Sequence, residues 1–538
     1  MIALLLSAVA AASPPAAGMV YFALVDRFAD GMEDSAESID PADLQAWHGG
    51  DLVGVQAHLP HLAEMGVSTL WLSPVFHSRQ DKFHGHGAFH GYWVENLDGV
   101  EARFGGDDAL VSLAEAAEAH GISLVLDMVY NHVSFDSEML TTHPDWFHPP
   151  QTIVDWNDPV QLVTHQVHGL PDLAQENDAV YHYLLGRSLH WARLTDAAGI
   201  RVDAVRHLPP EFLHRISADL RSHQGADFWI LGEDFQGDPV QLSQSMRDGG
   251  FDAMFDFPLR YAMVDVFCQD AHPGRLAGVL SLDRLYDNPR GLVTFLDNHD
   301  LPRIASECGG ERRRVANALL WMFSVRGIPS ITYGTEWLLT GAAEPENRES
   351  IDWSVEPVLA EGIAMLQQMR AAHPVLLDGI RVIEHLDEHQ LRISKATPEE
   401  TATIVINRGS QPIPPPDGVT AWLVSDESGF AQGTAEAPSV TPGGVGVFFS
   451  AGQARQHPTL VTVPITGGTG WLVGSGPELG NWNPDYGIEL GPGAQVTLPA
   501  GTVVEWKHVT RDETGSVVWP EGANRYDRIT AGVPLVVE

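Results

Sequence analysis

The chain has 538 residues, and its 71 acidic residues outnumber its 31 basic residues, which gives a formal net charge of −40. A chain of this length can form more than one domain, and a surface this acidic argues against nucleic acid and anionic membranes as partners, because both require a basic surface. The two cysteines, Cys268 and Cys308, are too few for a disulfide framework or a thiolate metal cluster, and the sequence leaves their pairing open.

The first 18 residues read as a leader. The run MIALLLSAVAAASPP is largely apolar for about a dozen residues and ends with Ala10-Ala11-Ala12, which is typical of a secretory signal peptide and its small-residue cleavage site. No lysine or arginine precedes the run, and the run is too short to span a bilayer. We therefore expect residues 1–18 to be a signal peptide and leader, and the protein to be a secreted, extracellular monomer.

Strand-like and helix-like stretches alternate from residue 19 to residue 375. The first strand is expected at residues 19–27, a helix with Asp51 as its N-cap at residues 51–67, and the next strand at residues 68–74. Strands that alternate with helices in this way form parallel βα units. The pattern predicts eight such units, which close into a (β/α)8 TIM barrel of the α/β class.

Three intervals depart from this alternation. Residues 133–180 are rich in His, Pro, Asp and Trp, and we expect them to form a small B domain inserted in the barrel. Residues 376–450 contain short strands between Pro, Gly and Ser clusters, which predicts a small antiparallel all-β C domain. After a linker at residues 451–458, residues 459–538 are expected to form a second all-β domain with Gly-rich turns.

Four apolar stretches of the predicted barrel end abruptly in polar residues. They are residues 122–132 (ISLVLDMVYNH), 199–208 (GIRVDAVRHL), 228–234 (FWILGED) and 292–300 (LVTFLDNHD). The carboxyl ends of barrel strands converge on one face, where catalytic residues lie. The sequence therefore predicts a single site that contains Asp127, Asn131, His132, Arg201, Asp203, His207, Glu233, Asp297, Asn298, His299 and Asp300.

Three of these residues point to a particular chemistry. Asp203, Glu233 and Asp300 would crowd three carboxylates into one cleft, which raises the pKa of at least one and leaves a neutral acid beside an ionised partner. Such a pair suits the cleavage of a glycosidic bond. Arg201 lies two residues before Asp203 on the same strand, so both side chains point into one space and the arginine can hold the aspartate ionised. Two further residues could donate hydrogen bonds to sugar hydroxyls, namely His132 and His299.

A metal site is a second interpretation of the polar strand ends. Asn131, Asp172 and the backbone carbonyl of His207 would supply mixed oxygen ligands, which suit a hard cation such as calcium better than zinc. The compact histidine motif that zinc hydrolysis requires is not found. Taken singly, each of these residues is more often an ordinary turn residue.

The last domain carries tryptophans in turns. Trp482 and Trp519 resemble exposed stacking platforms, and Lys507 and Asn524 are polar residues of the same domain that we expect beside them. Flat aromatic rings beside polar groups suit the apolar face and the hydroxyls of a sugar. Trp506, which alternates within a strand, is expected in the core.

The four polar strand ends resemble the signature regions of the α-amylase family, glycoside hydrolase family 13. Further matches are WHGGDL at Trp47–Leu52, HGYW at His90–Trp93, LPDL at Leu170–Leu173 and GIPSITYGTE at Gly327–Glu336. In order along the chain they cover roughly residues 19–375. The next domain resembles the β-sandwich C domain of that family. LVGSGPELGNW, LPAGTVVEWK and VVWPEGANR, between residues 472 and 525, resemble a starch-binding domain of carbohydrate-binding module family 20.

The resemblance implies a role for each matched residue. It makes Asp203 the nucleophile, Glu233 the general acid and base, and Asp300 the stabiliser of the transition state, with Asp297 structural. It implies that the substrate is bound by His90, Tyr92, His132, Arg201, Arg206, His207 and His299. It implies that the cofactor Ca²⁺ is bound by Asn131, Asp172 and the carbonyl of His207. Starch binding by the last domain would involve Trp482, Lys507, Trp519 and Asn524. Arg206 is a departure, because many α-amylases have lysine there.

Together these expectations favour a secreted, calcium-dependent, retaining endo-α-1,4-glucan hydrolase that acts on starch and maltooligosaccharides. The alternative is a cyclodextrin glucanotransferase or a maltogenic amylase-type enzyme, in which a sugar hydroxyl is the acceptor. The sequence lacks the immunoglobulin-like domain that precedes the starch-binding domain in cyclodextrin glucanotransferases, which favours hydrolysis. A non-catalytic starch-binding protein ranks last, because all three essential carboxylates are present.

Overall fold

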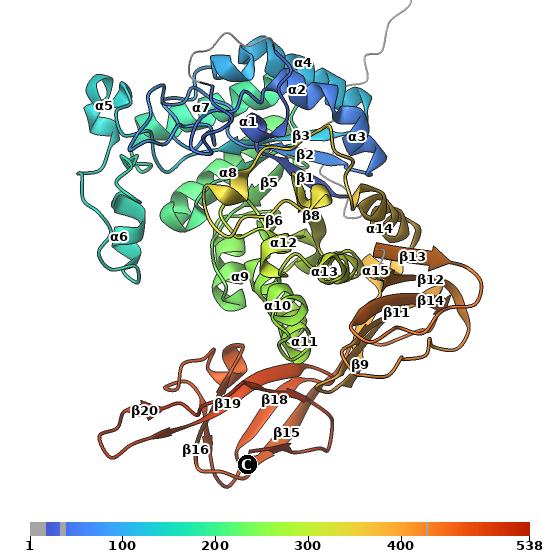
Figure 1. The fold of residues 1–538 in the computed structure, drawn as a ribbon. Coiled ribbons are helices and arrows are strands. Elements are labelled where there is room, and N and C mark those ends of the chain that lie inside the picture. The colour runs from blue at the N-terminus through green and yellow to red at the C-terminus, as the bar shows by residue number, and fades with distance from the viewer. Residues whose placement is uncertain (1–17, 33–38, 427–428, 538) are drawn as a thin grey trace, which may run out of the picture.

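The computed structural model describes residues 18–32, 39–426 and 429–537, so the expected leader lies outside the described residues except for Gly18. Eight parallel strands close into a barrel in chain order, which confirms the predicted (β/α)8 fold (Figure 1). The strands are almost entirely buried, because helices cover a parallel barrel on the outside. They are β1 (Val20–Ala23), β2 (Thr69–Leu72), β3 (Ser123–Met128), β4 (Gly199–Val202), β5 (Trp229–Gly232), β6 (Ala253–Phe255), β7 (Leu292–Thr294) and β8 (Ile328–Thr332).

The helix expected at residues 51–67 is two helices, α2 (Leu52–Ala57) and α3 (Leu59–Glu64). Asp51 caps α2 as predicted, since its Oδ1 accepts from Gly54 N at 2.7 Å. Pro60 lies in the first turn of α3, where its missing N–H is tolerated, and this position explains the break.

The other barrel helices pack around the strands (Figure 1). None of the described helices is long and apolar enough to cross a membrane. The helices are α1 (Val25–Phe28), α4 (Gly106–Ala119), α7 (Asp178–Leu194), α8 (Pro210–Gln224), α9 (Pro239–Asp248), α10 (Phe257–Phe267), α11 (Gly274–Ser281), α12 (Ile304–Glu307), α13 (Arg312–Ser324), α14 (Ala360–Ala372) and α15 (Val375–Asp378). A disulfide between Cys268 and Cys308 joins the ends of α10 and α12, which answers the question that the sequence left open.

The B domain leaves the barrel after β3 and carries two short helices, α5 (Met139–Thr142) and α6 (Pro159–Thr164), which project from the barrel in Figure 1. It returns close to its starting point, because Leu173 N donates to the carbonyl of Asn131 at 2.9 Å. An isolated β-bridge also pairs His132 with Asp172. The inserted segment is therefore attached directly beside the end of β3.

In the described residues of the C domain, the strands pair into one antiparallel sheet where a β-sandwich was expected. Its strand order is β13-β12-β14-β11-β10-β9. One face packs on barrel helices, including α13, and shares a core with them, so helices take the place of a second sheet. The strands are β9 (Ile380–Leu386), β10 (Gln390–Ala396), β11 (Glu400–Asn407), β12 (Val419–Asp426), β13 (Gly429–Gly433) and β14 (Gly444–Ala451).

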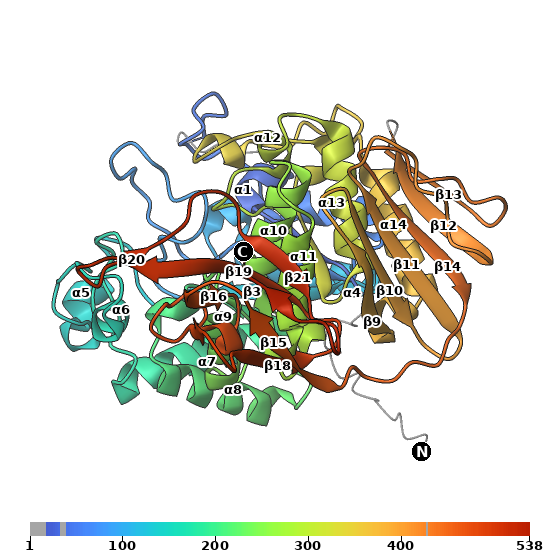
Figure 2. The ribbon, with the colours of Figure 1, turned by 90° about the horizontal axis from the view of Figure 1, so that it is seen from below.

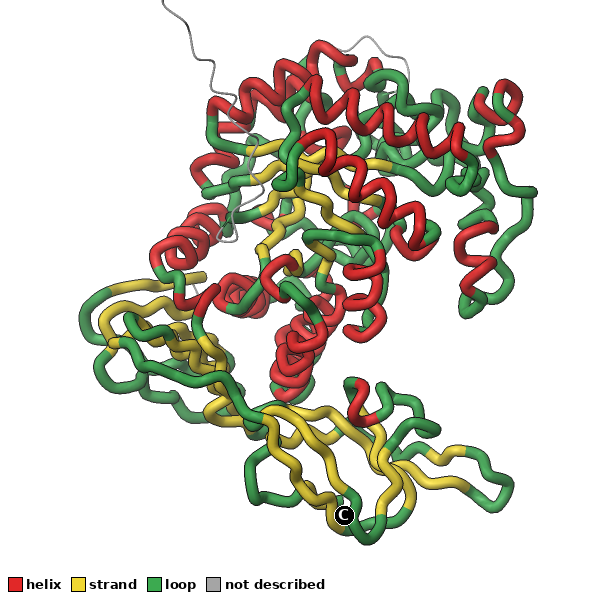
Figure 3. The backbone as a smooth tube through the Cα atoms, turned by 180° about the vertical axis from the view of Figure 1, so that it is seen from behind, coloured by secondary structure: helices red, strands yellow, loops and turns green. Residues whose placement is uncertain are grey.

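Residues 452–459 have no regular secondary structure and lead to the last domain, which has two sheets and its own core (Figure 3). One sheet has the order β18-β15-β22 and the other β17-β16-β19-β20, with β21 paired to β19. Trp506 is 1% exposed in this core, as expected. The strands are β15 (Leu460–Thr466), β16 (Gly470–Gly474), β17 (Ile488–Leu490), β18 (Gln495–Pro499), β19 (Val503–Arg511), β20 (Val517–Val518), β21 (Arg525–Arg528) and β22 (Leu535–Val536).

The last domain packs directly on the barrel. Strands β19 and β21 lie along α11 (Figure 2). Polar contacts cross this interface: Arg275 Nη1 lies 3.1 Å from Glu505 Oε2, and Val503 N donates to Ser281 Oγ at 2.9 Å. A second set of contacts involves the first part of the domain, where Arg284 pairs with Glu478 and Asn481 Nδ2 donates to Asp238 Oδ2.

Arg275 should stabilise this interface. Glu505 is 3% exposed, so Arg275→Ala would leave a buried carboxylate without its cation and lower the free energy of unfolding by about 1–3 kcal/mol. Calorimetry measures the change, and Arg187→Ala, which removes a surface ion pair with Asp98, is the control. Equal melting curves for the two variants would contradict this role.

Candidate active site

The guanidinium group of Arg201 is the centre of the site. Arg201 lies on β4 and is fully buried, and its Nη1 lies 2.8 Å from Asp127 Oδ1 and 2.6 Å from Asp203 Oδ1. Its Nη2 lies 3.1 Å from Glu233 Oε2. Burial by itself would lower the pKa of Arg201, but the acidic groups around it raise that pKa well above its usual value. One cation therefore gathers carboxylates from β3, β4 and the end of β5.

The three carboxylates predicted to act together lie beyond the ends of β4, β5 and β7. Burial raises the pKa of Glu233 to about 8, and the nearby carboxylate of Asp203 adds to the effect. Burial would also raise the pKa of Asp300, but His299 and Arg348 lower it below its usual value. The site therefore combines a neutral acid with an ionised carboxylate at neutral pH.

The backbone turns sharply after Asp203. Ala204 has φ 51° and ψ 46°, in the left-handed region that residues with a Cβ rarely adopt. Its N–H donates to Glu233 Oε2 at 3.4 Å, and Val205 N donates to the carbonyl of Glu233 at 2.8 Å. This strained turn fixes Asp203 and Glu233 relative to each other.

The predicted histidines and Tyr92 form one group beside the carboxylates. The rings of Tyr92 and His299 stack with centroids 4.9 Å apart and planes 7° apart, and His299 Nε2 lies 3.1 Å from Asp300 Oδ2. His132 Nε2 lies 3.1 Å from the carbonyl oxygen of Tyr92, and His90 Nδ1 accepts from Tyr92 N at 3.0 Å. Burial lowers the pKa of all three histidines, so their neutral rings can donate one hydrogen bond each.

Sequence reasoning missed three members of this site. Trp71 Nε1 donates to Asp127 Oδ2 at 3.0 Å, but Trp71 lies within β2, where the sequence pattern predicts an ordinary core residue. Arg348 Nη2 lies 3.1 Å from Asp300 Oδ1 and also pairs with Glu344. Arg348 and Glu344 come from a long loop after β8, where no strand end marks them.

Arg206 and His207 connect the barrel to the B domain. Arg206 Nη2 donates to the carbonyl of Trp156 at 3.1 Å, and His207 Nδ1 lies 3.0 Å from the carbonyl oxygen of Leu162. Both side chains are therefore held by the inserted segment. Phe235, three residues after the end of β5, is 45% exposed, and no sequence pattern singled it out.

The residues predicted to bind a cation also come together. The side-chain oxygen of Asn131 lies 2.8 Å from the carbonyl oxygen of His207 and 3.2 Å from Asp172 Oδ1. Three oxygens that face one another need either a turned amide, whose nitrogen would donate to the other two, or a cation between them. Elsewhere in the described part of the chain, no three His, Cys, Asp or Glu side chains gather as a metal site.

The four residues predicted to bind starch lie on neighbouring strands and turns of the last domain. Trp482 lies in a turn with φ 62° and is partly exposed, and Trp519 is 43% exposed. Lys507 Nζ donates to the carbonyls of Pro520 and Gly522, directly after Trp519. Asn524 has another partner, because its Nδ2 donates to Oε1 of the interface residue Glu505 at 2.6 Å.

Two family models match the chain. The model described as the α-amylase catalytic domain matches residues 22–374, well over half of the sequence, and the model described as a starch-binding domain matches residues 467–535. The chain belongs to the α-amylase family.

Individual relatives divide between two activities. A cyclomaltodextrin glucanotransferase from Klebsiella oxytoca is 26% identical and matches 94% of this chain and 91% of its own length. The crystal structure of the α-amylase from Geobacillus thermoleovorans complexed with acarbose is 30% identical, with a TM-score of 0.72 over 82% of this chain and all of that one. A gamma-CGTase from alkalophilic Bacillus clarkii, 22% identical, shares the fold over 98% of this chain and 99% of its own, with a TM-score of 0.73.

Family membership makes this protein a starch-active enzyme of glycoside hydrolase family 13. The family covers both hydrolases and transferases, so it does not settle which acceptor is used. The match to a starch-binding domain assigns the last domain as a carbohydrate-binding module of family 20.

The raised pKa of Glu233 predicts the alkaline limit of this α-amylase family enzyme. A general acid must carry its proton, so activity on soluble starch should fall as the pH rises through about 8, where Glu233 ionises. The measurement is kcat/KM against pH, with circular dichroism to show that the fold persists over the same range. Activity that still increases above that pH would contradict the assignment of Glu233 as the acid.

Proposed function

We propose that the protein is a secreted, retaining endo-α-1,4-glucan hydrolase, an α-amylase that cleaves starch and maltooligosaccharides. The proposal rests chiefly on Arg201, whose Nη1 and Nη2 hold Asp203 and Glu233 at 2.6 and 3.1 Å. Two carboxyl groups held by one guanidinium are close together, and retaining glycosidases use carboxyl groups only about 5–5.5 Å apart. Secretion rests on the apolar leader at residues 1–18.

The first step of the proposed reaction forms a covalent intermediate. The protonated carboxyl of Glu233 gives its proton to the glycosidic oxygen while a carboxylate oxygen of Asp203 attacks the anomeric carbon. The bond from that carbon to the leaving oxygen breaks, and a glycosyl ester with Asp203 forms. Asp300, which accepts from neutral His299, is placed to stabilise the positive charge that develops on the sugar ring.

The second step releases the product with the original configuration. Ionised Glu233 takes a proton from a water molecule, and the water oxygen displaces Asp203 from the anomeric carbon. Two inversions at the same carbon give retention, and both carboxyl groups return to their starting protonation states.

Transglycosylation is the second candidate, because a cyclomaltodextrin glucanotransferase is similar over 94% of this chain. The first step would be identical, and a sugar hydroxyl would replace water in the second. The exposed ring of Phe235 offers apolar surface to such an acceptor sugar. The starch-binding domain follows the C domain after only residues 452–459, which leaves no room for the immunoglobulin-like domain of cyclodextrin glucanotransferases and favours hydrolysis.

The product profile from amylose separates the two candidates. A hydrolase should give linear maltooligosaccharides and a matching rise in reducing ends, whereas cyclic products or transfer to added glucose would identify a transferase. Glu233→Gln should lower kcat/KM by about 10²–10⁴-fold for either activity. Val53→Ala, an exposed substitution on α2, is the control, and an active Glu233→Gln enzyme would contradict the mechanism.

We also propose that Ca²⁺ binds between Asn131, Asp172 and the carbonyl of His207. The donor set fits, because an amide oxygen, a carboxylate oxygen and a backbone carbonyl oxygen already face one another, and calcium prefers oxygen ligands. A bound calcium would supply charge neutralisation there and connect the end of β3, the B domain and the segment after β4. It takes no part in the bond-breaking steps.

Removal of calcium should therefore destabilise the enzyme. Chelation should lower the melting temperature, since a ligand at about 100 times its Kd contributes about 2.7 kcal/mol to stability. Asp172→Ala should melt at the same temperature with and without chelator, whereas Asp145→Ala, an exposed carboxylate of the B domain, should behave as the parent does. A parent enzyme insensitive to chelation would refute the site.

We propose Trp482 and Trp519 as stacking platforms for starch, with Lys507 supporting the loop after Trp519. The double substitution Trp482→Ala with Trp519→Ala should abolish adsorption to raw starch granules and leave activity on soluble starch unchanged. Val518→Ala, an exposed apolar neighbour, is the control for adsorption. A double variant that adsorbs as well as the parent would show that starch binds elsewhere.

A further inference from the structure

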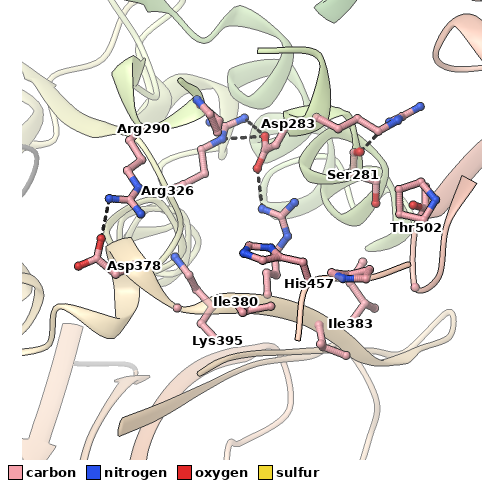
Figure 4. Close-up of a pocket in the computed structure, with 18 of the residues that line it drawn as sticks. Ser281, Asp283, Arg290, Arg326, Asp378, Ile380, Ile383, Lys395, His457 and Thr502 are labelled. Atoms are coloured by element: carbon pink, nitrogen blue, oxygen red, sulfur yellow. Dashed lines mark hydrogen bonds and ion pairs between the residues drawn. The ribbon is translucent and has the colours of Figure 1, made fainter. Parts of the chain in front are cut away.

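A pocket of about 520 Å³ lies where the barrel, the C domain and the starch-binding domain meet (Figure 4). The barrel contributes residues around the end of α11 and Arg326, and the C domain contributes β9 and Lys395 of β10. The linker contributes His457, and the starch-binding domain contributes residues 499–502. The pocket belongs to none of the sites described above.

Cationic side chains outnumber carboxylates in the lining of this pocket, although the chain as a whole carries a net charge of −40. The two lining carboxylates are already engaged: Asp283 accepts from Arg326 and from Arg381, and Asp378 pairs with Arg290 at 2.6 Å. Five cationic side chains line the pocket, namely Arg284, Arg290, Arg326, Arg381 and Lys395.

Lys395 is the cation without an acidic partner. It is 4% exposed, and its Nζ donates to the carbonyl of Leu376, which uses one of its three donors. Within the residues that the structure describes, no carboxylate forms an ion pair with it. Burial lowers the pKa of Lys395 well below its usual value, and the charges of Arg370 and Arg381 lower it further. Without an anion the buried lysine therefore favours its neutral form, and a bound anion would stabilise its ammonium form.

We propose that this junction pocket binds one small oxyanion, of the class of inorganic phosphate or sulfate, between the ammonium group of Lys395 and the guanidinium groups of Arg290 and Arg381. Guanidinium and ammonium groups form short, charge-assisted hydrogen bonds with such oxygens. The pocket volume of about 520 Å³ holds the ion together with water molecules, each of which takes about 30 Å³. The net charge of −40 on the whole chain disfavours a polymeric anion.

The position of the pocket gives the ion a structural role. Arg290 belongs to the barrel, Lys395 and Arg381 belong to the C domain, and His457 precedes the starch-binding domain. An ion bound there would neutralise charge that the barrel and the C domain bring together, and it would stabilise their arrangement beneath the starch-binding domain.

Equilibrium dialysis with radiolabelled phosphate at constant ionic strength tests the proposal. We expect saturable binding of one phosphate per chain, with sulfate as a competitor. Lys395→Met should weaken binding about tenfold or more, since it removes charged hydrogen bonds, and an apolar side chain of similar length suits a buried position. Thermal unfolding should show the same pattern, with phosphate raising the melting temperature of the parent more than that of Lys395→Met.

A second pair of variants distinguishes loss of phosphate binding from a folding defect caused by Lys395→Met. Arg290→Gln changes a half-exposed residue of the pocket and should also weaken phosphate binding, whereas Arg187→Gln removes a comparable ion pair far from the pocket and should not. Absence of saturable binding by the parent would overturn the proposal and indicate a neutral Lys395. Equal binding by the parent and Lys395→Met would overturn it as well.

Discussion

The active site depends on one buried cation. Carboxylates at the ends of neighbouring barrel strands repel each other and lose solvation, and either effect alone would keep them protonated. Arg201 opposes both effects, because its fully buried guanidinium contacts Asp127, Asp203 and Glu233 at once. Only parallel strands in register bring these residues together, since Asp127 is the direct β-pairing partner of Arg201. Burial still raises the pKa of Glu233 to about 8, so the arginine holds this carboxyl group in place and leaves it able to carry a proton.

The sequence predicted the barrel and most of the site because the signal is local. Asp203, Glu233 and Asp300 each come at or soon after the end of a short apolar strand, and such an ending can be recognised without knowledge of the fold. Arg348 could not be found in this way, because it reaches Asp300 from a loop with no periodic pattern. Trp71 was missed for the opposite reason, since a buried tryptophan in a strand is expected to be core.

Packing between domains was the part that the sequence could not supply. Alternating apolar residues show that a strand has a buried face, but they do not say what covers it. In the C domain one face is covered by helices such as α13, so a single sheet suffices where a sandwich was expected. The interface role of Glu505 also depends on a helix more than 200 residues earlier in the chain, and the same carboxylate accepts a hydrogen bond from Asn524, which is predicted to bind starch.

The starch-binding domain is packed against the barrel and is not connected to it by the linker alone. Contacts with α11 and the hydrogen bond from Asn481 to Asp238 hold it against the barrel. For modules on a loose linker, the length of the linker sets the effective concentration of the second binding event. Here the packing of the domain on the barrel sets this effective concentration. Avidity on a granule therefore depends on how well the glucan chains match one fixed distance, from Trp482 and Trp519 to the active site.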